Sequence, residues 1–146
     1  MKNNRGFSLL ELLIVVAIIL IIATIAIPSL LRSRQAANES SAVANLRTIN
    51  TAQVTYLSSN GGNFGTVTDL IAAGLIDSRF TGPVSGYSYG ITASQSDYTA
   101  TATPTSTNSG RYGYYSTPDA VVRYATYTGG TCAPCYPTGK SGSPVQ

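Results

Sequence analysis

Residues 5–28 read RGFSLLELLIVVAIILIIATIAIP, and this stretch decides how the chain is organised. Residues 7–27 are apolar almost throughout, and as a helix they extend about 31 Å, close to the thickness of the hydrocarbon core of a bilayer. Lys2 and Arg5 precede the run, which favours a cytoplasmic N-terminus for a single membrane span. Glu11 lies inside the run with no basic residue close to it. The stretch therefore predicts a membrane helix that carries one unexplained carboxylate.

Two ordinary interpretations explain this helix only in part. A secretory signal peptide has an apolar middle of about 7–15 residues, shorter than this run. In addition, Pro28 disfavours cleavage after the small residue Ala26. A plain single-span anchor fits the length but leaves Glu11 unexplained, because a carboxylate near the bilayer centre costs about 2.5–3.5 kcal/mol. Glu11 is only about one turn inside the run, where the cost is lower, so the plain anchor stays open.

A third interpretation accounts for the whole signal. The order of Lys2, Arg5, Gly6, Phe7 and Glu11 resembles the N-terminal signal of type IV prepilins and their relatives. The resemblance is closest over residues 1–57 and looser afterwards. It implies that a membrane peptidase cuts between Gly6 and Phe7 and that the new amine of Phe7 is N-methylated. Glu11 then becomes the fifth residue of the mature chain.

Cleavage at this position would explain the carboxylate. It creates a cationic amine at Phe7, and in a bundle of such helices Glu11 of one chain can face the Phe7 amine of its neighbour. A desolvated pair of this kind is weak evidence of net stability, but it fixes register, because a misplaced subunit leaves an uncompensated charge in an apolar core. We therefore assign Phe7 and Glu11 to assembly.

The helical pattern continues beyond the membrane segment. Pro28 lacks an N–H group and crowds the preceding turn, which predicts a kink over residues 24–28 within one long helix. The alternative is that Pro28 ends one helix and begins another. Asn60, Gly61 and Gly62 end the pattern. Its apolar face repeats at three- and four-residue steps and contains Leu31, Ala42, Val43, Leu46, Ile49, Ala52, Tyr56 and Leu57. The opposite, polar face is predicted to contain Arg34, Gln35, Asn38, Glu39, Ser40, Arg47 and Gln53.

The remaining residues predict a small β-rich domain. Thr66 or Thr68 can cap a short helical turn that Gly74 closes. Period-two alternation predicts four strands, over residues 87–93, 97–103, 111–116 and 120–127, with a hairpin loop at 94–96. The expected fold class is α+β: a long bent N-terminal helix, transmembrane in its first half, packed on a small antiparallel sheet of about four strands, as in pilins.

The expected domain organisation has four parts. They are a prepilin leader (1–6), a transmembrane or filament-core helix (7–28), an amphipathic helix (29–60) and a C-terminal β-rich region (61–146) with a flexible tail, frayed over residues 139–146.

Cys132 and Cys135 are the two cysteines of the chain. A zinc site needs about four ligands, and the chain has no His and no further Cys. A thioredoxin-like redox pair has this spacing but requires a βαβ setting instead of a Gly- and Pro-rich tail. A structural disulfide between Cys132 and Cys135 fits an extracytoplasmic domain, although closing so short a loop gains little entropy.

The sequence disfavours an enzyme. It shows no nucleophile–base pair and no phosphate-binding loop, and Asp69, Asp77, Asp97 and Asp119 are scattered singly. We therefore expect no catalytic residue, no metal and no cofactor. Nucleic acid is not expected as a direct specific ligand, because Lys and Arg form no run despite a net charge of +3.

The resemblance implies a structural subunit of a type IV pilus, which serves adhesion, twitching motility or DNA uptake. The implied partners are further copies or other pilins, the prepilin peptidase and methyltransferase, the assembly platform and the inner membrane. The precursor would cross the bacterial inner membrane once, with its N-terminus in the cytoplasm, before entering a cell-surface pilus or a periplasmic pseudopilus. Major and minor subunits are not distinguished.

Two alternatives remain at this point. One is a pseudopilin of a type II secretion system. The major pseudopilins typically bind calcium through acidic residues late in the chain, whereas no acidic residue follows Asp119 here. The more remote alternative is an extracytoplasmic binding domain held by a simple membrane anchor.

Overall fold

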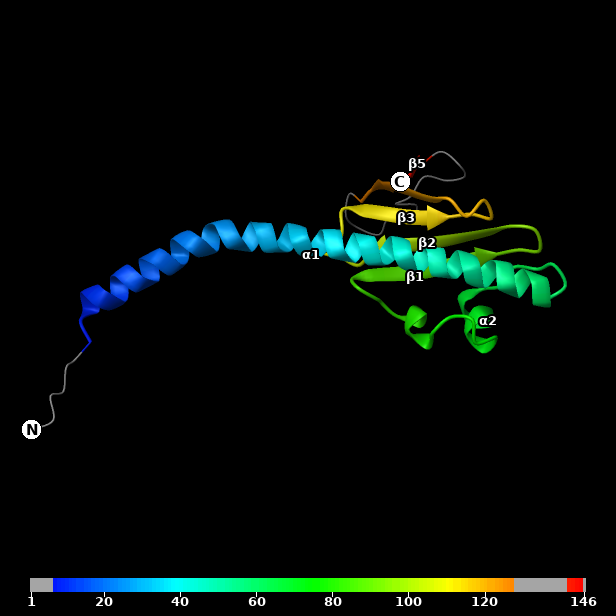
Figure 1. Cartoon of the computed structure of the whole chain (residues 1–146), viewed down its shortest axis with the longest axis horizontal. Coiled ribbons are helices and arrows are strands. Elements are labelled where there is room, and N and C mark those ends of the chain that lie inside the picture. Colours follow the sequence, from blue (N-terminus) through cyan, green and yellow to red (C-terminus); the bar gives the residue numbers. More distant parts are fainter. Residues whose placement is uncertain (1–6, 128–141, 146) are drawn as a thin grey trace, which may run out of the picture. The chain divides into compact units, whose positions relative to one another are not determined.

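The structure is a computed structural model, and it describes residues 7–127 and 142–145. The chain consists of two compact units, the first ending at Ser33 and the second beginning at Arg34. The elements, shown in Figure 1, are α1 (Leu9–Ser59), α2 (Val67–Ala72), the 3-10 helix η1 (Ser78–Thr81), β1 (Tyr87–Ala93), β2 (Tyr98–Pro104), β3 (Tyr112–Ser116), β4 (Val122–Thr126) and β5 (Ser143–Pro144).

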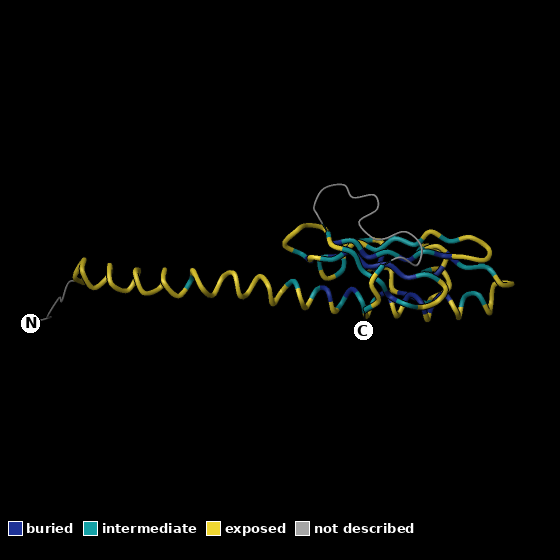
Figure 2. Tube along the Cα trace, turned by 90° about the horizontal axis from the view of Figure 1, so that it is seen from above, coloured by how far each residue is buried: buried dark blue, intermediate teal, exposed yellow. Residues whose placement is uncertain are grey.

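The described part of the first unit is the N-terminal portion of α1. The helix continues through Pro28, so the prediction of one long helix is confirmed, whereas the kink at Pro28 stays a prediction. Its large apolar side chains are all exposed in the single chain, from 80% at Leu9 to 41% at Leu31. Figure 2 shows this exposure along the whole segment.

The second unit contains the hydrophobic core. The C-terminal portion of α1 buries Ala42, Leu46 and Ile49 against a cluster that includes Tyr87 of β1 and residues of β2, β3 and β4. Burying a Leu or Ile side chain fully stabilises the fold by about 1.5–3 kcal/mol. Figure 2 shows the buried residues on the facing sides of helix and sheet. The predicted apolar face therefore packs over residues 42–52, whereas Leu31, which was predicted on the same face, is exposed.

The sheet is an antiparallel meander with the strand order β1-β2-β3-β4-β5. Burial alternates along β2, where Tyr98, Ala100 and Ala102 face the core. The small alanine side chains leave room for α1 to approach the middle of the sheet. The four predicted strands are present with bounds shifted by no more than two residues.

A fifth, short strand was not predicted. Residues 139–146 are expected from sequence to fray, but Ser143 and Pro144 pair with Tyr124 and Arg123 of β4. The N–H of Val145 also donates to the carbonyl of Val122 at 2.8 Å. Two residues give too short a pattern for alternation to be read, which explains the difference.

Local sequence explains the short elements that join α1 to the sheet. Thr66 caps α2 in a capping box, in which Asp69 Oδ2 accepts from the Thr66 N–H at 2.8 Å. Hydrogen bonds from Thr66 lower the pKa of Asp69. Gly74 follows the helix with φ of +68°, a conformation that suits glycine. The predicted helical turn is confirmed, with Thr66 as its cap.

The prediction that Glu39 and Gln53 lie on the solvent face of α1 is wrong. Both are buried on the same stripe as Leu46. Gln53 exchanges two hydrogen bonds with the backbone of Gly65, at 2.6 and 3.0 Å, and Glu39 forms an ion pair with Arg111. The buried stripe is wider than the apolar pattern because these polar side chains find partners inside it.

Candidate functional site: the apolar segment of α1

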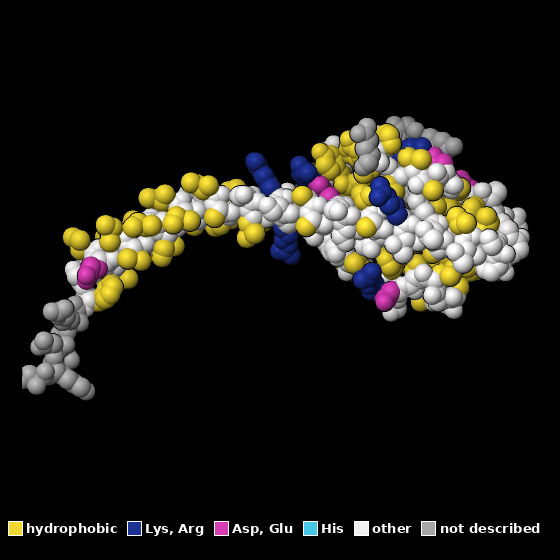
Figure 3. All heavy atoms as spheres, viewed as in Figure 1, with side chains coloured by type: hydrophobic (Ala, Val, Ile, Leu, Met, Phe, Trp, Pro, Cys, Tyr) yellow, Lys and Arg dark blue, Asp and Glu magenta, His cyan; other side chains and the backbone are white. Residues whose placement is uncertain are grey.

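The candidate site is the surface of residues 7–31, which we call the apolar segment. Its sixteen Leu, Ile and Val side chains and Phe7 are exposed, and Figure 3 shows hydrophobic atoms over the visible face of this part of the helix. Within the described chain, α1 is the one helix whose length and composition allow it to cross a membrane. Soluble monomers rarely expose an apolar surface of this extent, so lipid or other protein helices must cover it.

Glu11 lies in the first turn of α1. The backbone N–H of Ser8 donates to Glu11 Oε2 at 3.0 Å, and the N–H of Leu12 donates to the Ser8 carbonyl at 3.2 Å. A carboxylate in the first turn also interacts favourably with the helix dipole, by about 0.3–1 kcal/mol at an exposed position. Glu11 therefore has a structural role in the single chain, as a cap that satisfies the amide of Ser8.

This cap was missed at the sequence level, although its signal is readable. Ser8-Leu9-Leu10-Glu11 has the S-x-x-E spacing of a capping box, in which the Glu reaches back to the N–H of the cap residue. A carboxylate has two acceptor oxygens. Oε2 of Glu11 is occupied by Ser8, while Oε1 has no partner within the described residues. The cap thus leaves one oxygen free for a second donor.

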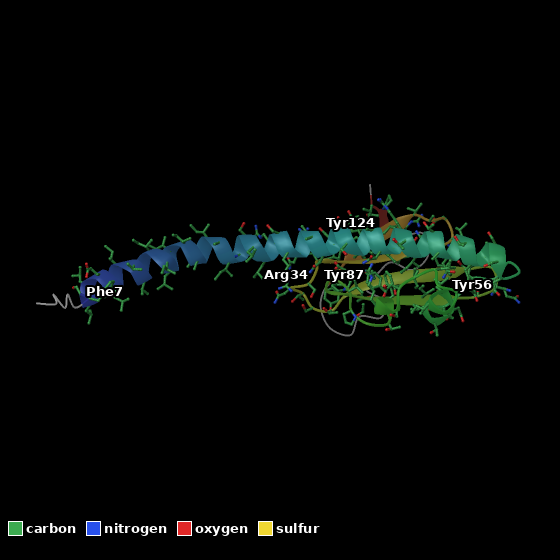
Figure 4. The ribbon with its side chains drawn as sticks, turned by 60° about the horizontal axis from the view of Figure 1, so that its bottom comes forward. Phe7, Arg34, Tyr56, Tyr87 and Tyr124 are labelled. Atoms are coloured by element: carbon green, nitrogen blue, oxygen red, sulfur yellow. The ribbon has the colours of Figure 1, made fainter. Side chains whose placement is uncertain are left out.

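The predicted assembly residues lie close together. Phe7 is exposed immediately before α1, where Figure 4 labels it, and Glu11 follows four residues later in the sequence. Inside the segment, the hydroxyl of Thr24 donates to the carbonyl of Ile21 at 2.8 Å and so needs no outside partner. The predicted cleavage residue Gly6 and the predicted disulfide of Cys132 and Cys135 lie outside the described residues.

The chain has recognisable relatives. Residues 1–27 match the family described as the prokaryotic N-terminal methylation motif. The chain is 49% identical over 56 residues to the type IV major pilin protein PilA of Myxococcus xanthus, which covers 38% of this chain and 26% of that protein. It is 41% identical over 75 residues to the type IV wide pilus major component PilA4 of Thermus thermophilus, which covers 51% of this chain and 57% of that protein. The chain is therefore similar to type IV pilins over its N-terminal part.

The extent of these matches is limited. The chain spans about a quarter of the length of the first relative and somewhat more than half of the second. No solved structure matches it. The β-rich part of the chain is therefore described by its own geometry.

Two ion pairs hold the second unit of the chain together. Glu39 of α1 is joined to Arg111 beside β3 at 2.9 Å, and Asp119 is joined to Arg123 of β4 at 2.7 Å. The hydrogen bond from Arg123 is the main cause that lowers the pKa of Asp119 to about 2, with help from Thr117 and against the effect of burial. Both pairs connect segments of the same unit, so their role is structural.

The buried tyrosines of the second unit have shifted pKa values. Burial raises the pKa of Tyr98 to about 12 and also raises the pKa values of Tyr87 and Tyr114. These phenols therefore stay protonated and act as packing and hydrogen-bonding groups, as when Tyr87 donates to the carbonyl of Tyr112 at 2.8 Å. Across residues 7–127 and 142–145, no group of three His, Cys, Asp or Glu side chains could hold a metal ion.

Proposed function

We propose that this chain is the structural subunit of a type IV pilus and polymerises through its apolar segment. The observation that carries the proposal is the exposed apolar helix surface that coincides with an N-terminal methylation motif. Such a surface needs an apolar environment in every state of the protein. A bilayer supplies one before assembly, and a bundle of identical helices supplies the other afterwards. Because both environments are apolar, moving between them costs little hydrophobic free energy.

Processing prepares the segment for this transfer. A prepilin peptidase cuts between Gly6 and Phe7 and removes Lys2 and Arg5, and the new amine of Phe7 is methylated. The cation at Phe7 then pairs with Glu11 of a neighbouring subunit. The geometry of Glu11 supports this step, because Oε1 has no donor among the described residues when Oε2 accepts from Ser8. A subunit that enters out of register leaves a charge without a partner in an apolar core, which opposes misassembly.

The location follows from the same features. Before assembly the precursor crosses the inner membrane once, with its N-terminus in the cytoplasm and the second unit on the other side. Lys2 and Arg5 ahead of the apolar segment support this orientation. An assembly platform moves the processed subunit into the filament. The two relatives are named as a major pilin and as the major component of a wide pilus, which favours a pilus over a secretion pseudopilus.

The test is the intact mass and N-terminal sequence of protein sheared from the surface of cells that produce this chain. We expect an abundant filament protein that begins with methylated Phe7. A filament fraction without this chain would contradict the proposed function. A chain that retains residues 1–6 or begins near Pro28 would contradict the proposed processing.

A further inference from the structure

A few charged side chains of the second unit have no partner among its described residues. Most of its charged groups have partners inside the unit, namely the ion pairs Glu39–Arg111 and Asp119–Arg123, the helix caps Asp69 and Asp77, and Arg79 over the ring of Phe80. Over the described residues of this unit, Arg34, Arg47 and Asp97 take part in no ion pair and in no hydrogen bond through their side chains. All three are exposed. These three charges are available to a partner.

Arg34 marks one end of the second unit. The next residue, Gln35, donates from Nε2 to the carbonyl of Thr107 at 2.8 Å, and Asn38 donates to the carbonyl of Ser109 at 2.9 Å. The loop between β2 and β3 therefore lies beside Arg34. This end presents a cation with no acid paired to it.

Asp97 marks the opposite end. It lies in the turn between β1 and β2, where the hydroxyl of Tyr98 donates to Asn50 at 2.9 Å and the ring of Tyr98 packs on Phe64 at 4.8 Å. From Arg34 to Asn50 the helix rises about 24 Å. Figure 1 shows the β1–β2 turn at the C-terminal end of α1, and Figure 4 labels Arg34 and Tyr56 at the two ends of this unit.

The C-terminal end of α1 adds to the negative charge beside Asp97. The helix ends at Ser59 and has no basic residue in its last turn. The C-terminal end of a helix carries a partial negative charge of about −0.5, and here no basic side chain of the last turn offsets it. The second unit is thus electronegative at the Asp97 end and electropositive at the Arg34 end.

We propose that Arg34 of one subunit docks against Asp97 of a second copy in a head-to-tail contact. The inference rests on the proposed function, because it describes how subunits of one filament meet. A contact between two different patches of the same chain generates a helical filament when its rotation does not close into a ring. Among the described residues of the second unit, Arg34 is the unpaired cation at one end and Asp97 the unpaired anion at the other, so every subunit inside the filament satisfies both. A two-fold contact through the Arg34 ends would instead bring like charges together.

The test exchanges the two charges in the full-length chain, in cells that hold no other copy of it. Arg34→Glu and Asp97→Arg are each expected to lower the yield of sheared filaments by roughly tenfold or more, because like charges then meet across the contact. The double variant is expected to recover to within roughly threefold of the unaltered chain, since the pair is restored with opposite polarity. Arg47→Glu is the matched control, because Arg47 is exposed on the same helix but between the two ends. Its effect is expected to be small, and Asp97→Arg should not compensate for it.

Several results would overturn the contact. Native filament yields from both single variants would do so, as would a defective double variant whose processed form is abundant in the membrane. Arg34→Gln and Asp97→Asn guard against misfolding, because each should give a smaller loss than the reversal, and native yields from both would refute the contact. If Arg34→Glu reduces membrane retention while Asp97→Arg has no effect, the group that faces Arg34 is a lipid phosphate and the contact is refuted. Absence of the unaltered chain from filaments would instead refute the proposed function.

Discussion

Glu39 and Arg111 form a three-bond clamp between α1 and the start of β3. Oε1 of Glu39 accepts from the backbone N–H of Arg111 at 2.8 Å and from its Nε at 3.1 Å, and Oε2 accepts from Nη2 at 2.9 Å. The two side chains are buried to very different extents, with 9% of the Glu39 side chain exposed against 56% for Arg111. The loss of stability is therefore expected to differ between removing Arg111 and removing the charge of Glu39.

Arg111→Met is expected to destabilise the second unit more than Glu39→Gln does. Without Arg111 the carboxylate of Glu39 stays buried with only a backbone donor, whereas without the charge of Glu39 the guanidinium remains solvated. We expect losses of about 1–3 kcal/mol for Arg111→Met and about 1 kcal/mol for Glu39→Gln, with the ion-pair share kept small because Arg111 is exposed. Denaturant unfolding of the detergent-solubilised chain measures both. Equal losses would show that burial of Glu39 does not decide the cost.

Ala120→Gly is expected to stabilise the protein. Ala120 has φ of +58°, which an L-residue adopts at a cost and glycine does not. Relief of that strain exceeds the entropy lost by glycine, for a net gain of about 0.5–1 kcal/mol. Ala37→Gly is the control, because the same change at an exposed position within α1 should cost about 0.5–1 kcal/mol. Thermal unfolding of both variants gives the comparison, and a loss of stability in both would mean that Ala120 is not strained.

The ionisation of Asp119 makes the stability of the second unit depend on pH. Its pKa is about 2 in the folded chain against the ordinary 3.8, so folding favours the ionised form. The contribution is complete above pH 3.8 and is lost as the pH falls toward 2. For a partly exposed pair it amounts to about 1 kcal/mol or less. Between pH 5 and pH 2, the free energy of unfolding should therefore fall less with decreasing pH for Asp119→Asn than for the unaltered chain. An identical pH dependence in the two proteins would contradict this role of Asp119.

Gly6→Leu is expected to leave uncut precursor in the membrane. The proposed processing cuts directly after Gly6, and we expect the peptidase to require a small side chain there. The measurement is the mass of the membrane-held chain, which should retain residues 1–6. Gly6→Ala, a smaller change, should be cut at least in part. Efficient cleavage of Gly6→Leu would mean that the leader has been misassigned.

The strands and the core stripe of the helix could be predicted because their signals are local. Tyr, Thr and Ala alternate along β1 and β2, and Leu46 and Ile49 repeat at helical spacing. The turn before β1 is also local in origin, with φ of 50° at Ser85 and 74° at Gly86, values that suit a type I′ turn.

The burial of polar residues on α1 could not be predicted because their partners are distant in sequence. Glu39 meets Arg111 across 72 residues, and Gln53 meets Gly65 across 12. A polar residue on a helix is ordinarily placed on the solvent face, and only the folded chain shows which one has a buried partner. The cap by Glu11 is instead a local feature that could have been predicted, since Ser8 lies three residues away and the S-x-x-E spacing is present in the sequence.

Glu11 has two roles that two substitutions can separate. Glu11→Ala removes both the charge and the acceptor for the Ser8 amide, whereas Glu11→Gln removes the charge but keeps an oxygen that can accept from Ser8. Cleavage depends on the leader, so both variants should be processed normally, as shown by their mass in the membrane. If Glu11 acts through the Phe7 amine of a neighbour, both should polymerise poorly, with filament yields lower by roughly tenfold or more, because the buried cation then lacks its partner. Normal filaments from Glu11→Gln together with defective filaments from Glu11→Ala would show that capping of α1, and not the charge, is what assembly requires.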